Sequence, residues 1–284
     1  MQIITKVISV TVLNEIFKIQ ESIFADAKFE SVVRCFSEST CELHKTNPHF
    51  YNHIFKASRI STLTVLMNYI LSGEVTTLSE FYNICNEYGY SGKNNAVSLI
   101  DFLVHTNRLR LIKGVDRRKK TPELTEKGMA SLKAYMMTLV KPLTIYDASL
   151  TEGLIDSDGY YKNFYSRASL LLGIQTSSFA FNVEDKSLDM YNKSGGMIFM
   201  LMIYNDLLNK EVELNTVIKK SYFVNLSYDI GVSSSHVNNL LDFSIKSKFI
   251  LKESRGYVIT REFIVSVERF VSFYLAFAHF LIHP

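Results

Sequence analysis

Apolar residues recur at helical spacing along most of the chain. Positions 7–24 carry enough of them for a well-buried helix, and 60–71 is a second strong apolar segment that Ser72-Gly73 closes. Asn47-Pro48 places an N-cap before a first-turn proline, so another helix is expected to begin there. Segments with helical spacing are 7–24, 29–36, 48–53, 60–71, 78–87, 125–140, 160–173, 196–208, 216–229, 233–247 and 262–282. The pattern therefore predicts a mostly helical protein.

Two stretches depart from simple helical spacing, one in each half of the chain. In the first, a helix capped by Ser91 or Asn94 is expected to end near His105, and alternation at 108–112 predicts an edge strand. A basic hairpin tip at 114–120 and a return strand follow. The second half is expected to contain a turn, a capped helix, a strand, a tight turn and a return strand at 230–232, 233–247, 249–252, 254–256 and 257–259.

A weak internal repeat accompanies this shared order of elements. The segment Leu99-Ile100-Asp101-Phe102 matches Leu240-Leu241-Asp242-Phe243 at an offset of 141 residues. The strands that follow match at 140, a slip of one residue that a changed helix end would explain. Because half of 284 is 142, the chain is expected to contain two copies of one unit, 1–142 and 143–284, with the linker inside 141–165.

The first stretch carries three features of a known family. Asn107-Arg108-Leu109 ends the expected recognition helix, Asp116-Arg117-Arg118-Lys119-Lys120 forms a wing, and Leu124-Thr125-Glu126-Lys127-Gly128 leads out of it. The order helix, turn, helix, strand, basic loop, strand, helix is that of a winged helix-turn-helix. Over roughly residues 60–140 the chain resembles the MarR-type (multiple-antibiotic-resistance regulator) transcription factors. A wing that begins Asp-Arg-Arg and leads into Leu-Thr-x-Lys-Gly is typical of that family.

The resemblance implies both a fold and a function. It implies two winged helix-turn-helix units, at about 60–128 and 196–262, joined by a shared helical region like the dimerisation helices of the family. The helices expected to pack together there are 7–24, 125–141, 160–173 and 262–282. One chain would then imitate a homodimer, as a pseudo-dimer, and place two recognition helices in successive major grooves of double-stranded DNA. The expected function is sequence-specific transcription regulation, chiefly repression by occlusion, without catalysis.

Positive charge is concentrated in the same two stretches. The window 91–120 holds eight basic and two acidic residues, a net charge of +6, and 233–261 holds five and two, a net charge of +3. Because the whole chain carries a formal +3, the remaining residues sum to −6. This distribution favours DNA phosphates as the partner, through salt-sensitive contacts. The second hairpin has only Arg255 at its turn, so a weaker grip on DNA is expected there.

Polar residues at the start of each predicted recognition helix are the candidates for base contacts. Asn can pair with adenine and Lys can reach guanine acceptors in the major groove, whereas the wing arginines of the family enter the minor groove. Taken singly, these side chains equally suit N-caps and solvent-facing positions, so the expectation rests on the set. The candidate DNA-binding residues are Ser91, Lys93, Asn94, Asn95, Ser98, Arg117, Arg118, Lys119, Lys120, Ser233, Ser234, Ser235, His236, Asn238, Asn239 and Arg255.

Cofactor chemistry finds little support in the chain. Three cysteines do not make a disulfide framework and fit a reducing cytosol. Cys41, His44, His49 and His53 fall within 13 residues, but their spacing matches no standard zinc module, so neither a metal nor a cofactor is expected. Nucleotide-binding, hydrolase and metalloprotease motifs are absent, so the sequence offers no candidate catalytic residue for an enzyme.

The location expected from the sequence is the cytoplasm, without a membrane partner. No signal peptide is visible in the first 21 residues, and Glu268 and Arg269 stop the apolar run 270–282 short of a membrane span. A small apolar or aromatic effector stays open as a partner, because 197–204 and 270–280 are rich in Phe, Tyr and Met. Core packing is the favoured explanation of these residues.

Two other functions remain open at this point. A plasmid-type replication initiator also joins two winged helices, and it would bind repeated origin sites together with replication partners. A protein-interaction module that has lost DNA binding is the second alternative, because the overall charge is modest and the second hairpin is reduced. The sequence leaves open whether a monomeric pseudo-dimer assembles further.

Overall fold

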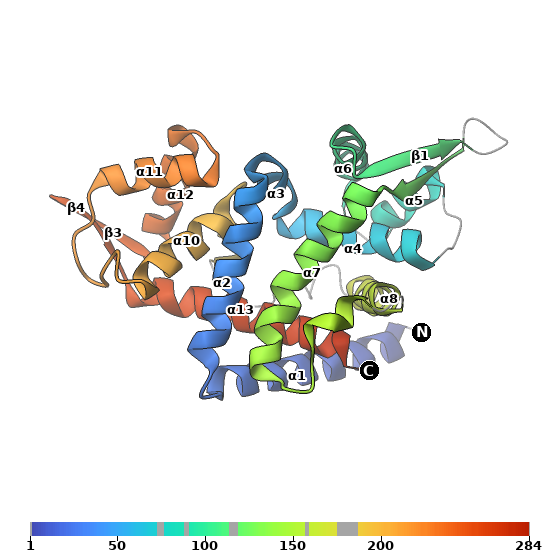
Figure 1. Cartoon of the computed structure of the whole chain (residues 1–284), viewed down its shortest axis with the longest axis horizontal. Coiled ribbons are helices and arrows are strands. Elements are labelled where there is room, and N and C mark those ends of the chain that lie inside the picture. The colour runs from blue at the N-terminus through green and yellow to red at the C-terminus, as the bar shows by residue number, and fades with distance from the viewer. Residues whose placement is uncertain are drawn as a thin grey trace.

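The computed structural model is mostly helical, with two small antiparallel sheets (Figure 1). It describes residues 2–72, 77–87, 91–113, 119–156, 159–174 and 187–283. The helices of the first half are α1 (Gln2–Ala25), α2 (Phe29–Thr46), α3 (Pro48–Ile54), α4 (Ala57–Ser72), α5 (Leu78–Glu87), α6 (Lys93–His105) and α7 (Glu126–Tyr146). Those that follow are the 3-10 helix η1 (Glu152–Asp156), α8 (Tyr160–Ile174), α9 (Ser187–Tyr191), α10 (Gly196–Leu208), α11 (Lys220–Ile230), α12 (Ser234–Lys246) and α13 (Arg261–Ile282). The hairpins are β1 (Leu109–Lys113) with β2 (Lys120–Leu124), and β3 (Ile250–Glu253) with β4 (Gly256–Ile259). The expectation of a mostly helical chain with small β-hairpins is confirmed.

Two helices of the first half continue well past their predicted C-terminal ends. α2 continues past residue 36 to Thr46, because buried residues recur at helical spacing along its whole length. α7 was expected to end before Pro142 but continues to Tyr146, so that prediction was wrong. Pro142 is buried, and the packing of α7 against α2 outweighs the roughly 3 kcal/mol that an interior proline costs. The expected boundary between residues 142 and 143 therefore lies inside a continuous helix.

α11 is shorter than predicted, because the chain before it pairs with a strand. Ile218 donates its N–H to the carbonyl of Tyr257 at 2.7 Å, and its own carbonyl accepts from Tyr257 at 2.9 Å. This bridge extends the β3–β4 hairpin by one more backbone segment. The helix can begin only after the bridge, at Lys220 rather than at 216.

The internal repeat is visible in the backbone. α6 and α12 are both 13 residues long, and each is followed by a residue with positive φ, Asn107 (56°) and Lys248 (63°), which lie 141 positions apart. β1 and β3 begin at Leu109 and Ile250, again 141 positions apart. The predicted slip of one residue is therefore wrong, because Phe249 occupies the position of a residue before the strand rather than within it.

Helices of the two halves interleave. α2 packs on α7 and also on α10, whereas α8 packs on α4 and α1 runs along α13. In Figure 1, α1 and α13 lie together at the base, α2 and α7 rise from it, and the two hairpins project at opposite ends. The expectation that the terminal helices pack together is confirmed by the contacts of α13 with α1, α7 and α8. The sequence did not place α2 in this region.

α3 is anchored to the second half by a buried asparagine. Asn52 donates from Nδ2 to the carbonyl of Ile230, at the end of α11, over 2.7 Å. Its Oδ1 lies 3.0 Å from Nε2 of buried His44, and its carbonyl accepts from the Ser194 hydroxyl. Gly231 has a φ of 70°, and a Cβ there would lie 2.8 Å from Cβ of Pro48. The turn between α11 and α12 is thus pressed directly against α3.

α13 is long and apolar enough to cross a membrane, judged by length and composition alone. Half of its most apolar window is buried in the structure, where the helix packs along α1. Core helices of water-soluble proteins pass the same test, so this property is weak evidence for a membrane.

Replacing Asn52 by alanine should destabilise the protein by about 2–3 kcal/mol, because the carbonyl of Ile230 and the ring of His44 lose a buried partner. Urea denaturation measures the change in unfolding free energy. Asn163→Ala, at an exposed position of α8, is the matched control and should change it by less than about 0.5 kcal/mol. Equal effects of the two substitutions would contradict the anchoring role of Asn52.

Candidate nucleic-acid interface

α6 presents a polar face to solvent at its N-terminal end. It buries Ala96, Leu99, Ile100 and Leu103 on its inner face. Its opposite face exposes Lys93, Asn94, Asn95 and Ser98. The predicted caps were wrong, because the N-cap is Gly92 and no side chain caps this helix. Ser91 is half-buried beside the cap. The candidate base-contacting residues of the first half therefore share one accessible surface.

Arg59 of α4 also reaches this surface, and sequence reasoning missed it. Its Nη2 lies 3.3 Å from the hydroxyl of Ser98, and its Nη1 lies 3.4 Å from the carbonyl of Asn95. No local pattern in the sequence connects Arg59 with α6, which is more than thirty residues away. Its guanidinium adds a positive charge beside the N-terminal half of the helix.

α12 presents the equivalent face in the second half, but part of it is engaged. Ser233 is the N-cap and accepts from the backbone N–H of His236 at 3.2 Å. The ring of His236 lies 2.6 Å from the carbonyl of Ser194, so this side chain ties α12 to the segment before α10 and does not project freely. The hydroxyl of Ser234 lies 3.4 Å from that of Ser227. The exposed candidates that carry none of these contacts are Ser235, Asn238 and Asn239.

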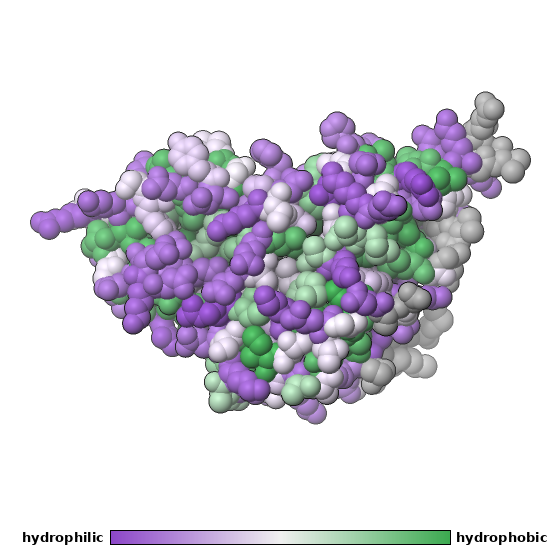
Figure 2. All heavy atoms as spheres, viewed as in Figure 1, coloured by the Kyte–Doolittle hydropathy of each residue, from purple (hydrophilic) through white to green (hydrophobic). Residues whose placement is uncertain are grey.

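The two hairpins differ in length and charge. In β1–β2, Lys113 pairs with Lys120 at the outer end, and Lys119 and Lys120 are exposed. Arg117 and Arg118 lie outside the described residues. β3–β4 closes between Glu253 and Gly256, which leaves Arg255 exposed at a short turn. In Figure 2, hydrophilic atoms cover the projecting tip of β3–β4 and much of the edge above α6.

Two arginines of the first hairpin contribute less surface charge than the sequence count assumed. Arg110 donates from Nε to the carboxylate of Glu123 across the strands at 2.7 Å. Arg108 is only 5% exposed, and its guanidinium carbon lies 3.4 Å from the centroid of the Phe50 ring. Arg108 also donates from Nε to the Ser131 hydroxyl at 3.0 Å. Its role is to join the hairpin to α3 and α7, not to meet phosphate.

The close packing of the backbone around Arg108 explains why a glycine stands at position 128, at the end of the segment Leu124–Gly128. A Cβ on Gly128 would lie 2.1 Å from the carbonyl oxygen of Arg108. Thr125 caps α7 by accepting from the N–H of Gly128 at 3.0 Å, and its hydroxyl donates to the carbonyl of Asn107. The first turn of α7 therefore fits against the end of α6 only without a side chain at position 128.

A small apolar pocket, with a cavity volume of about 80 Å³, lies beside Arg108. Its lining includes Phe50, Tyr51, Met67, Leu103, Tyr135 and Tyr165. The segment 197–204, which was considered for an effector pocket, is buried in the core, and none of it lines this pocket. The pocket lies where α3, α4 and α7 meet the start of the hairpin.

The four weak metal candidates are not brought together. Cys41 is buried, and desolvation raises the pKa of its thiol to about 12. His44 is bound to Asn52, as described above. His49 is exposed, and the ring of His53 stacks on Phe102 of α6 with centroids 3.8 Å apart. Among the described residues, no three of these side chains form a group with ligand spacing.

Comparison with known proteins identifies no relative: no protein-family model, curated protein or solved structure matches the chain.

Acid should loosen the contact between α3 and α6. Burial, followed by the charges of Arg59 and Lys56, lowers the pKa of His53 to about 4. In the unfolded chain it returns to about 6.5, so below that pH the unfolded state takes up the proton first. The unfolding free energy is therefore expected to fall as pH drops from about 6.5 to about 4.

His53→Gln should flatten this dependence, measured by urea denaturation between about pH 7 and pH 5. His49→Gln, at an exposed position of the same helix, should keep the slope of the parent protein. A parent-like slope in the His53 variant would show that the proton is taken up elsewhere.

Proposed function

We propose that the chain is a sequence-specific, DNA-binding transcription regulator with two winged helix-turn-helix units in one chain. The observation that carries the proposal is the pair α6 and α12. They are equally long, occupy equivalent places in the repeat, expose polar residues at their N-terminal halves and precede a β-hairpin. This combination supports their use as recognition helices in the major groove.

Base contacts are assigned to the exposed polar residues of these helices. Asn94 and Asn95 on α6, and Asn238 and Asn239 on α12, carry the amide groups that pair with adenine. Lys93 supplies a charge at the start of α6. Because the two exposed sets differ, the preferred site is an imperfect palindrome rather than a symmetric one.

Phosphate contacts are assigned mainly to the first unit. Lys119 and Lys120 are exposed near the outer end of its hairpin, and Arg117 and Arg118 adjoin them in the sequence. Arg59 adds a charge beside α6. The motif of this unit resembles the MarR-type wing, whose arginine enters the minor groove. Repression by occlusion of the bound site is the proposed mode of regulation.

The apolar pocket beside Arg108 is the proposed place for a small apolar or aromatic effector. It borders Leu109 at the start of the hairpin and Leu103 at the end of α6. A molecule that enlarged it would push on both elements at once. Effector binding would thereby change the orientation of the first unit on DNA.

One observation favours a protein-interaction module as the alternative. The second unit exposes three large apolar side chains, Val217, Tyr228 and Leu251, whereas the described part of the first hairpin exposes Ile112 together with Lys113, Lys119 and Lys120. Apolar side chains make no charge-assisted contacts with DNA phosphates, so these residues would not contribute to DNA binding of that kind. The alternative therefore applies most directly to the second unit.

Selection of bound fragments from the host genome at moderate salt tests the proposal. Enrichment of a site with two unequal half-sites about one helical turn apart, 34–36 Å, is the expected outcome. Repeated sites clustered at one origin would instead identify a replication initiator. Failure to enrich any sequence would favour the interaction module.

Lys119→Ala with Lys120→Ala should weaken DNA binding and reduce the salt dependence. Each phosphate contact contributes about 0.9 to the slope of log affinity against log salt concentration, so the slope should fall by about 1.8. Lys162→Ala with Lys210→Ala removes the same charge at exposed positions away from the hairpins and is the control. A slope that changes equally in both double variants would remove the hairpin from the interface.

A further inference from the structure

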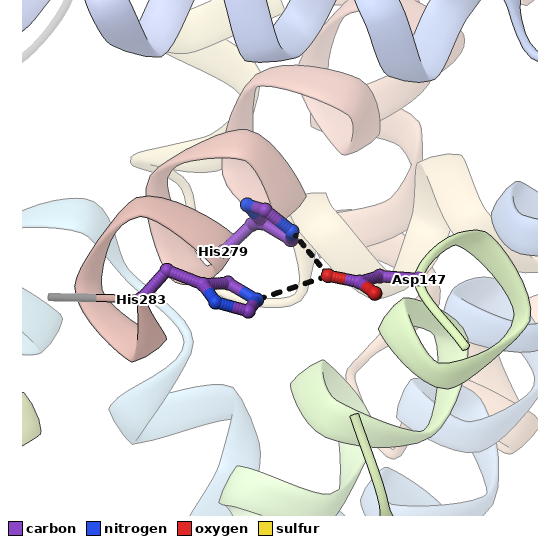
Figure 3. A group of neighbouring side chains, drawn as sticks. All are labelled: Asp147, His279 and His283. Atoms are coloured by element: carbon purple, nitrogen blue, oxygen red, sulfur yellow. Dashed lines mark hydrogen bonds and ion pairs between the residues drawn. The ribbon is translucent and has the colours of Figure 1, made fainter. Parts of the chain in front are cut away.

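Three side chains with metal-ligand chemistry meet at the base of the molecule (Figure 3). His279 and His283 lie four residues apart at the C-terminal end of α13, so their rings face the same side of the helix. Asp147 is the C-cap of α7, where the backbone leaves the helix and the carboxylate turns toward the two rings. The cluster lies outside the proposed DNA interface.

The geometry of the cluster suits a shared cation. Oδ2 of Asp147 lies 3.0 Å from Nε2 of His279 and 3.0 Å from Nε2 of His283. His279 makes a hydrogen bond to this oxygen. Nε2 of His283 is buried and makes no hydrogen bond, although it lies equally close. Nε2 of His283 therefore has a lone pair available for an ion, whereas Nε2 of His279 would exchange its hydrogen bond with Oδ2 for a bond to the ion.

The surroundings of the cluster hold its ligands in place. Oδ1 of Asp147 accepts from the backbone N–H of Ser149 at 2.9 Å and from its hydroxyl at 2.7 Å, which leaves Oδ2 directed at the histidines. The backbone N–H of His283 donates to the carbonyl of His279, and the carbonyl of His283 accepts from Arg167 at 2.7 Å. These contacts fix the carboxylate of Asp147 and the backbone of His283, whereas Nδ1 of His279 is buried without a hydrogen-bond partner among the described residues.

We propose that Asp147, His279 and His283 form a zinc site, with water or an external group as the fourth ligand. Two imidazoles and one carboxylate are a ligand set that zinc takes in tetrahedral geometry. Zinc–ligand bonds of about 2.0–2.1 Å place tetrahedral ligand atoms about 3.3 Å apart, close to the two 3.0 Å separations here. All three ligand atoms lie within 4.8 Å of one another, so the two rings would close on the ion from that range.

Zinc at this site joins the two halves of the chain. Asp147 ends the last helix of the first half, and the two histidines end the last helix of the second. The ion would therefore tie α7 to α13 below the units that carry α6 and α12 (Figure 1). In a consequence that rests on the proposed function, bound zinc would restrict the distance between the two recognition helices.

Chelator-treated full-length protein, titrated with zinc sulfate in competition with a chromophoric chelator, tests the site. The expected result is one zinc ion per chain, and His283→Ala should weaken binding by at least about 100-fold. Asp147→Asn should weaken it as well. His49→Ala removes an exposed histidine elsewhere and should bind like the parent. Cobalt substitution should give the visible absorption of a tetrahedral ion in the parent and lose it in the His283 variant.

Thermal unfolding without metal controls for folding, because zinc should raise the melting temperature of the parent and of His49→Ala but not of His283→Ala. Absence of stoichiometric binding, or equal affinity in the parent and His283→Ala, would overturn the zinc site. The zinc titration and the thermal unfolding are made without DNA, so their outcome does not depend on DNA binding. A chain that binds zinc but no DNA would contradict only the proposed function. A chain that binds DNA but no zinc would contradict only the zinc site.

Discussion

The contacts of α3 are the constraint on which the arrangement of the rest depends. One end of this seven-residue helix is pressed against the α11–α12 turn by Asn52 and by the close approach of Gly231 to Pro48. On its other side, Phe50 stacks on Phe102 of α6 with centroids 5.6 Å apart. A buried cation–π contact such as that of Arg108 with Phe50 contributes up to about 2 kcal/mol. Neither α6 nor α12 can shift without moving α3.

Because of this constraint, the two copies of the repeat do not correspond to two independent domains. Two independent domains would each bury their own helices, but here α2 packs on α10 and α8 packs on α4. A helix of each half thus covers the helix that precedes the helix-turn-helix of the other half. A single chain can hold this exchange together without the concentration dependence of a dimer. The two halves are therefore expected to unfold as one cooperative unit.

Local patterns predicted much of the fold and little of what holds it together. The buried face of α6 and the order of helix, hairpin and helix follow from spacing within a few residues. The burial of Arg108 could not be predicted, because its partner Phe50 lies 58 positions away and nothing in the sequence distinguishes it from a surface arginine. His236 was assigned to DNA for the same reason, since its contact with Ser194 depends on tertiary packing.

The difference between the two units follows from the same packing. In the first, Arg108 fills the position that Phe249 takes in the second, and a pocket opens beside it. In the second, the turn at Gly231 lies directly on α3, and the hairpin is short. The second unit is thus held to the body by the close fit of its turn on α3 and by the side chains of Asn52 and His236, whereas the first has a cavity beside its buried arginine. Under the proposed function, the second unit sets the register of the protein on DNA. The first unit supplies the phosphate contacts through its exposed lysines. Its pocket also makes it the unit that can respond to an effector.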